Sequence, residues 1–451
     1  MWPRKAPWFT GTLVPDGGFA AELLMIKTCQ MNVSVYIASR LQLKPDGGHR
    51  SPGVVIAISG IAVAVTVMIL TLSVVTGFKN GIRDKVIGFD SELTVTALPA
   101  TDEFGYADPA TAMFHYDADL DKAIRLTVGD DVDIRPTMTA TAVLKTDSAF
   151  LGLNLMAWDA DTDYPFIERH MVEGTLPDYR ADSTANQAVI SRVAADELNL
   201  AIGDKVYTYF FTGGNMRTRR VTVAGIYDTM FGERDRMVAF CSMPLLRGVY
   251  SVDSLTVGGV MIAGMDLDRV SDASVDLQNM LLRKIYNGEM PKALEVSTVY
   301  NTGAVYFGWL DLLDTNVWVI IFLMTVVASF TLVSSLFILI LERVRMIGLL
   351  KSLGATNMQV RRIFLFLAMK IVIWGMVAGN LLAVALILIQ MKWHIIPLDP
   401  ESYYLSYVPT EFNLFHLVAV DVATLVVSWL VMVFPSMIIS TISPARSMRY
   451  E

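Results

Sequence analysis

Four long apolar runs constrain this chain more than any other feature of its sequence. They occupy residues 51–78, 315–341, 363–391 and 417–441, and the second reads TNVWVIIFLMTVVASFTLVSSLFILIL. Each has the roughly 20 residues that an α-helix needs to cross about 30 Å of hydrocarbon. A buried helix of a soluble protein could imitate one such run, but four in one chain predict a membrane protein with four transmembrane α-helices. The composition agrees, because 53% of the residues are hydrophobic and only 18% are charged.

The short segments beside these runs indicate their orientation, because Lys and Arg gather on the cytoplasmic side. The connection between the second and third runs contains five basic residues and one acid: Arg343, Arg345, Lys351, Arg361, Arg362 and Glu342. Basic residues also precede the first run and follow the last. We therefore expect residues 342–362 and both termini to be cytoplasmic. Residues 79–314 and 392–416 would then face outward.

The long segment between the first two runs has the pattern of a mixed α+β domain. Residues 91–98, 204–211, 219–228 and 254–262 have the β-branched and aromatic content of strands. Helical patterns at 191–200 and 275–288 predict helices. Beyond the first run, Phe78, Ile82, Val86 and Phe89 recur near one helical face, which predicts a stalk. We expect residues 79–314 to form a large extracytoplasmic α+β domain with helical stalks, inserted between transmembrane helices 1 and 2.

The two ends of the chain give weaker patterns. Residues 1–30 have no sustained periodicity, and we expect them to be a non-native or disordered extension. Residues 31–50 would be an amphipathic cytoplasmic segment, and residues 442–451 a cytoplasmic tail. Lys370 and Asp421 lie near the ends of their spans, where such side chains can reach the membrane interface.

The chain contains no sequence motif for covalent chemistry. A phosphate-binding loop of the Walker A type requires Gly-Lys, and that dipeptide is absent from the sequence. The sequence also has no H-E-x-x-H, C-x-x-C or G-x-S-x-G motif, and its five histidines are scattered. We expect no catalytic residue, no metal site and no directly bound cofactor. The net charge of −8 argues against nucleic acid as a partner.

The segment LERVRMIGLLKSLGATNMQVRRIFLF, at 341–366, is better organised than an ordinary loop. Val344, Ile347, Leu350 and Leu353 recur every three residues, broadly on one side of a helix. Gly354 is placed to end that helix, and Thr356-x-x-Gln359 has the form of a capping box that starts the next one. Two interpretations remain open: an amphipathic helix resting on anionic lipid, or a docking helix for a cytoplasmic partner.

The same segment resembles the coupling segment of the FtsX-like ABC transporter permeases. This superfamily includes cell-division permeases, macrolide-type efflux permeases and lipoprotein-releasing permeases. Within it, MIGLLKSLGA is more similar to the lipoprotein-releasing branch. The first span and stalk at 57–89 and the loop IIPLDPESYYLSYVP at 395–409 are similar to that branch as well.

The resemblance implies a non-catalytic permease subunit of the bacterial inner membrane that works by mechanotransmission. Its implied partners are a cytoplasmic ABC ATPase dimer, which would bind ATP and Mg, a second permease protomer, identical or paralogous, a lipoprotein substrate, a periplasmic lipoprotein carrier and membrane lipid. The implied ATPase-coupling residues are Glu342, Arg343, Arg345, Met346, Ile347, Leu350, Lys351, Leu353, Gly354, Ala355 and Thr356. The implied lipid or substrate cavity residues are Val67, Leu70, Val74, Phe78, Phe322, Val326 and Phe330.

Two alternatives remain beside this interpretation. The chain could be another FtsX-like permease, serving efflux or cell-division regulation. It could instead be a receptor with an outer sensory domain, but such a receptor requires a cytoplasmic signalling module, and the longest cytoplasmic element expected here is the 342–362 segment. The sequence leaves open which lipoproteins and which carrier are handled.

Overall fold

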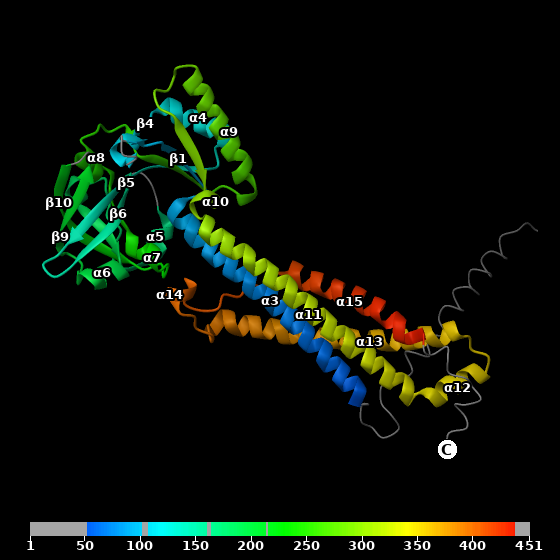
Figure 1. Ribbon diagram of the computed structural model, residues 1–451. Coiled ribbons are helices and arrows are strands. Elements are labelled where there is room, and N and C mark those ends of the chain that lie inside the picture. The colour runs from blue at the N-terminus through cyan, green and yellow to red at the C-terminus, as the bar shows by residue number, and fades with distance from the viewer. Residues whose placement is uncertain (1–51, 102–106, 160–163, 213–214, 438–451) are drawn as a thin grey trace, which may run out of the picture. The chain divides into compact units, whose positions relative to one another are not determined.

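The computed structural model describes residues 52–101, 107–159, 164–212 and 215–437 (Figure 1). The extension predicted at 1–30, the amphipathic segment at 31–50 and the tail at 442–451 lie outside these residues. The chain divides into two compact units. Among the described residues, the membrane unit comprises 52–73, 317–388 and 412–437, and the outer unit comprises those within 74–316 and 389–411.

Among the described residues, four helices are long and apolar enough to span a membrane. They are α3 (Pro52–Asp90), α11 (Ala304–Glu342), α13 (Asn357–Trp393) and α15 (Leu414–Ser436). Figure 1 colours them blue, yellow-green, orange and red. The predicted architecture, four apolar helices with an α+β domain between the first and second, is confirmed. Helix α3 also continues past Phe78 to Asp90, so the predicted stalk is helical.

Within the membrane unit, two glycines let α13 approach α3 closely. A Cβ atom on Gly375 would lie 2.8 Å from Cβ of Ile61, and one on Gly379 would lie 2.7 Å from the Ala62 carbonyl oxygen. The Thr66 hydroxyl on α3 also donates to the Gly379 carbonyl at 3.0 Å. Small residues spaced by four, with a hydroxyl beside them, are typical of close helix pairs in membranes.

The outer unit is built on a mixed ten-stranded sheet with the order β14-β1-β13-β5-β6-β11-β8-β10-β7, in which β9 pairs with both β10 and β5. Its strands are β1 (Leu93–Ala97), β5 (Asp133–Lys145), β6 (Phe150–Trp158), β7 (Met171–Gly174), β8 (Gln187–Ser191), β9 (Lys205–Thr212), β10 (Asn215–Tyr227), β11 (Val238–Ser242), β13 (Gly259–Ala263) and β14 (Leu294–Thr298). Two small sheets join β12 (Thr256–Val257) to β4 (Phe114–His115) and β2 (Ala100–Thr101) to β3 (Ala107–Asp108).

Further helices complete the unit: α4 (Ala118–Val128), α5 (Pro165–Arg169), α6 (Arg192–Leu198), α7 (Glu233–Met237), α8 (Met243–Tyr250), α9 (Leu267–Tyr286), α10 (Val299–Thr302) and α14 (Pro400–Tyr403).

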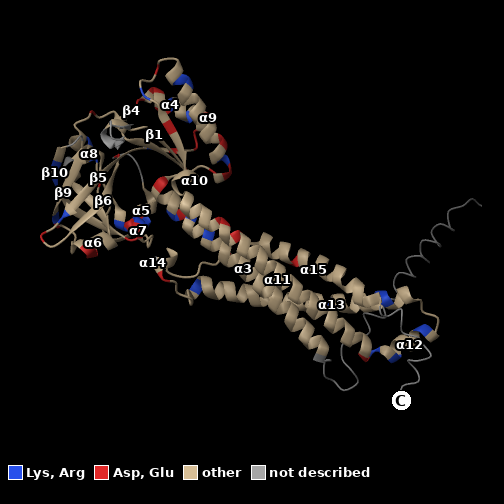
Figure 2. Ribbon diagram, viewed as in Figure 1, with Lys and Arg blue, Asp and Glu red and all other residues tan. Residues whose placement is uncertain are grey.

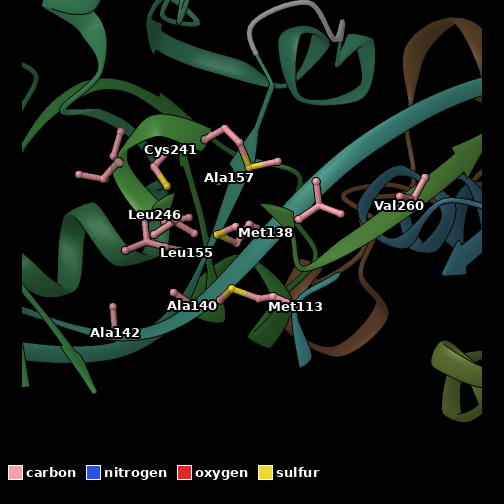
Figure 3. Close-up of a cluster of buried hydrophobic side chains, with 14 of the residues drawn as sticks. Met113, Met138, Ala140, Ala142, Leu155, Ala157, Cys241, Leu246 and Val260 are labelled. Carbon is pink, nitrogen blue, oxygen red and sulfur yellow. The ribbon is translucent and has the colours of Figure 1, made fainter. Parts of the chain in front are cut away.

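The sheet buries one face because successive side chains along a strand point to opposite sides. Leu151, Leu153 and Leu155 of β6 point into the core, whereas Phe150 and Asn154 are exposed. Figure 3 shows Leu155 among the packed side chains of that core.

Most of the strands and helices predicted in this domain are confirmed, with two differences. The strand predicted at 254–262 is wrong as a single element, because the chain changes partners at Gly258 and forms β12 and β13. The helix predicted at 275–288 begins earlier, at Leu267, where the Asp266 side chain caps it by accepting from the Asp268 amide.

Candidate functional site

The segment between α11 and α13 forms a short helix, α12 (Val344–Ser352), with a well-defined end. Gly354 adopts a φ of +93°, which glycine tolerates without strain. Its amide donates to the Lys351 carbonyl at 3.1 Å, and the Ala355 amide donates to the Leu350 carbonyl at 3.0 Å. This pair of bonds is a Schellman motif, so the predicted glycine stop is confirmed.

The predicted restart of the chain as α13 is confirmed as well. The Thr356 amide donates to the Gln359 side chain at 2.8 Å, and the Gln359 amide donates to the Thr356 hydroxyl at 3.3 Å. These reciprocal bonds are a capping box, which satisfies amides that the first turn of a helix leaves unpaired. Two helices therefore meet at a short turn whose backbone conformation is fixed by hydrogen bonds.

The apolar side chains of α12 do not all lie on one side of the helix, as the spacing of three had predicted. Ile347 is fully buried, and Met346 and Leu350 pack partly buried against the core of the membrane unit. Leu353 was expected on that side but is 78% exposed. A spacing of three falls short of the 3.6 residues of a helical turn, so after nine residues the stripe has rotated by about 180°.

The residues on the exposed side of α12 are spaced four apart in the sequence. Arg345, Leu349 and Leu353 lie on it, and the two leucines are 55% and 78% exposed. Leu349 is a residue that the sequence reasoning missed, although its four-residue spacing from Leu353 was a signal that could have found it. Figure 2 shows Lys and Arg along the same helix. The segment thus presents apolar side chains within a basic surface.

The predicted cavity residues fall into two environments. In the outer unit, Phe78 is buried and packs edge-on against Trp309 with ring centroids 5.4 Å apart. In the membrane unit, Phe322 and Phe330 are 67% and 70% exposed. The others are half-buried: Val67, Leu70, Val74 and Val326. That these residues line a lipid or substrate cavity stays a prediction.

A lysine in the stalk joins three segments of the outer unit. The Lys85 ammonium donates to the Tyr404 carbonyl at 2.5 Å and to the Met230 carbonyl at 3.4 Å. Tyr404 lies in the loop after α13, and its ring packs against Phe231 and Tyr306. Nearby on the stalk, Lys79 pairs with Asp314 at 2.7 Å. Lys79 and Lys85 lie on the expected outer side of the first span, where the rule that basic residues gather in the cytoplasm does not predict them. Both have hydrogen-bonding partners within the outer unit.

The outer face of strands β6, β5, β9 and β10 exposes large apolar side chains. Four are more than half exposed: Phe150, Tyr207, Phe211 and Met216. Lys145 lies between two of them, because it is paired across the strands with both Tyr207 and Phe150. Exposed apolar groups on a sheet face are typical of a surface that binds another protein.

Two family models match the chain. The model of the FtsX-like permease C-terminal domain matches residues 318–444, and that of the MacB-like periplasmic core domain matches residues 54–279. A "Lipoprotein-releasing system transmembrane protein LolC" of Xylella fastidiosa is 25% identical over 437 residues, covering 93% of this chain and 99% of that protein. The LolC of Neisseria meningitidis is 25% identical over 91% of this chain and 97% of its own length. The LolE of Haemophilus influenzae is 22% identical over 92% and 99%.

Two solved structures are similar to part of the chain. The extracellular domain of the transporter YknZ, from Gram-positive bacteria, covers 46% of this chain and all of its own, at 15% identity and a TM-score of 0.29. The periplasmic region of MacB from Actinobacillus actinomycetemcomitans covers 50% of this chain and 97% of its own, at 13% identity and a TM-score of 0.32.

Proposed function

Since the chain belongs to the FtsX-like permeases that carry a MacB-like periplasmic core domain, we propose that it is the permease subunit of an ABC transporter that extracts lipoproteins from the bacterial inner membrane. The observation that carries this proposal is the match to proteins named as lipoprotein-releasing over nearly their whole length. In this role the chain is non-catalytic. A separate cytoplasmic ATPase dimer binds ATP and Mg, both termini of the permease are cytoplasmic, and the substrate is passed to a periplasmic carrier.

Extraction of a lipoprotein is costly, which is why it requires ATP. Each CH₂ group withdrawn from the bilayer costs about 0.8 kcal/mol, and a mature lipoprotein has three acyl chains. In the proposed mechanism, closure of the ATPases pushes on α12, and α13 moves because the capping box connects the two helices. Helix α3 runs unbroken from Pro52 to Asp90, and a continuous helix transmits displacement better than a flexible linker.

The exposed side of α12 is the proposed contact with the ATPase. Leu349 and Leu353 supply apolar area there, and Arg345 lies on the same side. Buried Ile347 and half-buried Leu350 instead hold α12 against its own unit. The coupling residues expected from the sequence thus divide into those that would contact the partner and those that would position the helix.

Charged replacements on the two sides of α12 test this division. Leu353→Asp, or Leu349→Asp, is expected to abolish co-purification with the ATPase subunit while the permease remains folded in the membrane. The matched control is Leu126→Asp, which places the same charge at a 76% exposed leucine of the outer unit. If both α12 variants retain full ATPase binding and coupled activity, α12 is an interfacial helix and the docking proposal is wrong.

Helix α11 has an exposed apolar stripe that suits the acyl chains. Trp318, Phe322 and Phe330 are 67–72% exposed. Trp318 and Phe322 are neighbours on one face because they are four residues apart, and the stripe turns by about 120° around the helix between Trp318 and Phe330. We place the acyl chains between this stripe and a second permease protomer. Val326 and the half-buried residues of α3 named above would complete the apolar lining.

Carrier binding is assigned to the exposed face of β6, β5, β9 and β10. A lipoprotein carrier must present apolar surface to receive acyl chains, and the aromatic side chains of this face offer complementary area. Tyr207→Glu combined with Phe211→Glu is expected to reduce cross-linking to the carrier, with ATPase binding unchanged.

Depletion of the protein tests the substrate class in cells. Mature lipoproteins destined to leave the inner membrane are expected to accumulate there, as measured by membrane fractionation. If they still leave at the normal rate, the lipoprotein assignment is wrong, and a role in efflux or cell-division regulation becomes the better account.

A further inference from the structure

An amide and a carboxyl meet between two helices of the membrane unit. Asn380 of α13 donates its side-chain N–H to Oδ2 of Asp421 on α15 at 2.7 Å. Asn380 lies near the middle of the stretch 371–391, which has no charged residue. Asp421 is seven residues, about 10 Å, inside the start of α15. It is half-buried, and its carboxyl accepts a hydrogen bond from Asn380.

Each of these side chains leaves one oxygen without a partner. Oδ1 of Asn380 and Oδ1 of Asp421 are both buried and accept no hydrogen bond from any described residue. Burying two unpaired acceptors among apolar side chains costs free energy, and burying an ionised carboxylate there costs more. An ionised Asp421 therefore leaves the site unsatisfied.

Among the described residues of the membrane unit, no lysine or arginine lies within one helical turn of Asn380 or Asp421 along their own helices. The described membrane-unit parts of α3 (52–73) and α11 (317–341) contain no charged residue. On α13, Lys370 is ten residues before Asn380, about 15 Å along the helix. On α15, His416 is five residues before Asp421, more than one helical turn away.

We propose that Asp421 carries a proton and forms a cyclic acid–amide pair with Asn380. The Asn380 N–H donates to Oδ2 of Asp421, and the protonated Oδ1 of Asp421 donates to Oδ1 of Asn380. One proton, taken up from solvent, satisfies both unpaired acceptors and leaves the pair neutral. The result is a hydrogen-bonded clasp between α13 and α15.

Next to the clasp, α13 also forms a hydrogen bond with α3. The neighbouring residue, Gly379, accepts the Thr66 hydroxyl from α3 at 3.0 Å. Consecutive residues of α13 thus hold the helix to α3 and to α15. Under the proposed function these three helices move together when α12 is pushed. The protonation of Asp421 does not depend on that function.

Infrared spectroscopy of the full-length protein in detergent at neutral pH tests the protonation state directly. The difference spectrum between wild type and Asp421→Asn is expected to contain the C=O stretch of a protonated carboxylic acid, shifted to lower frequency in D₂O. A difference spectrum that contains carboxylate bands instead would overturn the proposal.

Stability measurements on the same protein give a second test. Asp421→Asn keeps a neutral donor–acceptor pair, and so does the exchange of Asn380→Asp with Asp421→Asn, so both are expected to melt near the wild-type temperature. Asp421→Leu and Asn380→Leu break the pair and are expected to lower the melting temperature by roughly 2–4 °C. If Asp421→Asn is as destabilising as Asp421→Leu, the negative charge is required and the protonated clasp is wrong.

Discussion

Lys85 shows how one side chain can hold separate segments together. Its ammonium donates to the carbonyls of Met230 and Tyr404, residues whose φ angles of +54° and +58° are unfavourable for non-glycine residues. Such backbone conformations persist where their surroundings fix them. Lys85 is 9% exposed, so its loss would leave both carbonyls with little access to water.

Replacing Lys85 with Met tests this role, because methionine retains the apolar length of the side chain and removes the donor. The free energy of unfolding is expected to fall by about 2 kcal/mol, the typical cost of leaving buried polar groups unpaired. Thermal unfolding of the full-length protein in detergent measures it, with exposed Lys205→Met as the control. Equal stability of the two variants would contradict a structural role for Lys85.

We expect Asp235 to make the free energy of unfolding depend on pH. It is 1% exposed and accepts from the amides of Thr229 and Phe231, each at 3.1 Å. Burial nevertheless raises its pKa above the ordinary value of an aspartate. The folded state therefore holds the proton more tightly than the unfolded state. The stability that this carboxyl contributes is greatest below the ordinary aspartate pKa and is lost as the pH rises through the raised value.

The variant Asp235→Asn cannot titrate at this position. The unfolding free energy of wild type minus that of Asp235→Asn is expected to fall as the pH rises from about 4, the ordinary aspartate pKa. Denaturation of both proteins across this pH range measures the difference. A difference that increases with pH would show that the hydrogen bonds from Thr229 and Phe231 outweigh burial.

At the scale of elements, the close approach of α3 and α13 rests on glycine. Gly379→Val would place Cβ against the Ala62 carbonyl and Val65, neither of which can move without shifting α3. Overpacking of this kind typically costs 1–3 kcal/mol, so we expect a lower melting temperature and less folded protein in the membrane. Gly308→Val is the matched control, because a Cβ there has no neighbour within 4 Å. If the two variants behave alike, the contact is not tightly packed.

Local features of the elements could be read from the sequence, and features that depend on distant partners could not. The glycine stop at Gly354 and the capping box from Thr356 follow from residues within one helical turn. The break at Gly258 depends on which strands flank β12 and β13, and those partners lie more than 100 residues away. The pairing of Asp421 with Asn380 likewise joins two helices whose contact the sequence does not specify.

At the scale of the whole molecule, the chain combines four apolar helices, a large inserted domain and a short basic helix, without a sequence motif for binding ATP. Under the proposed function, this arrangement transmits work supplied by another subunit. The exposed leucines of α12 and the exposed stripe of α11 are unpartnered apolar surfaces within the described chain. A complex with an ATPase and a second permease protomer would cover both.

Reconstituted lipoprotein release tests the central claim most directly. The permease, its ATPase and its second protomer are placed in proteoliposomes with a mature lipoprotein, and the soluble carrier is added outside. The account predicts that ATP and Mg transfer lipoprotein to the carrier, and that Leu353→Asp abolishes the transfer while Leu126→Asp does not. Hydrolysis of ATP by the assembled complex with no lipoprotein transferred above the ATP-free level would contradict it.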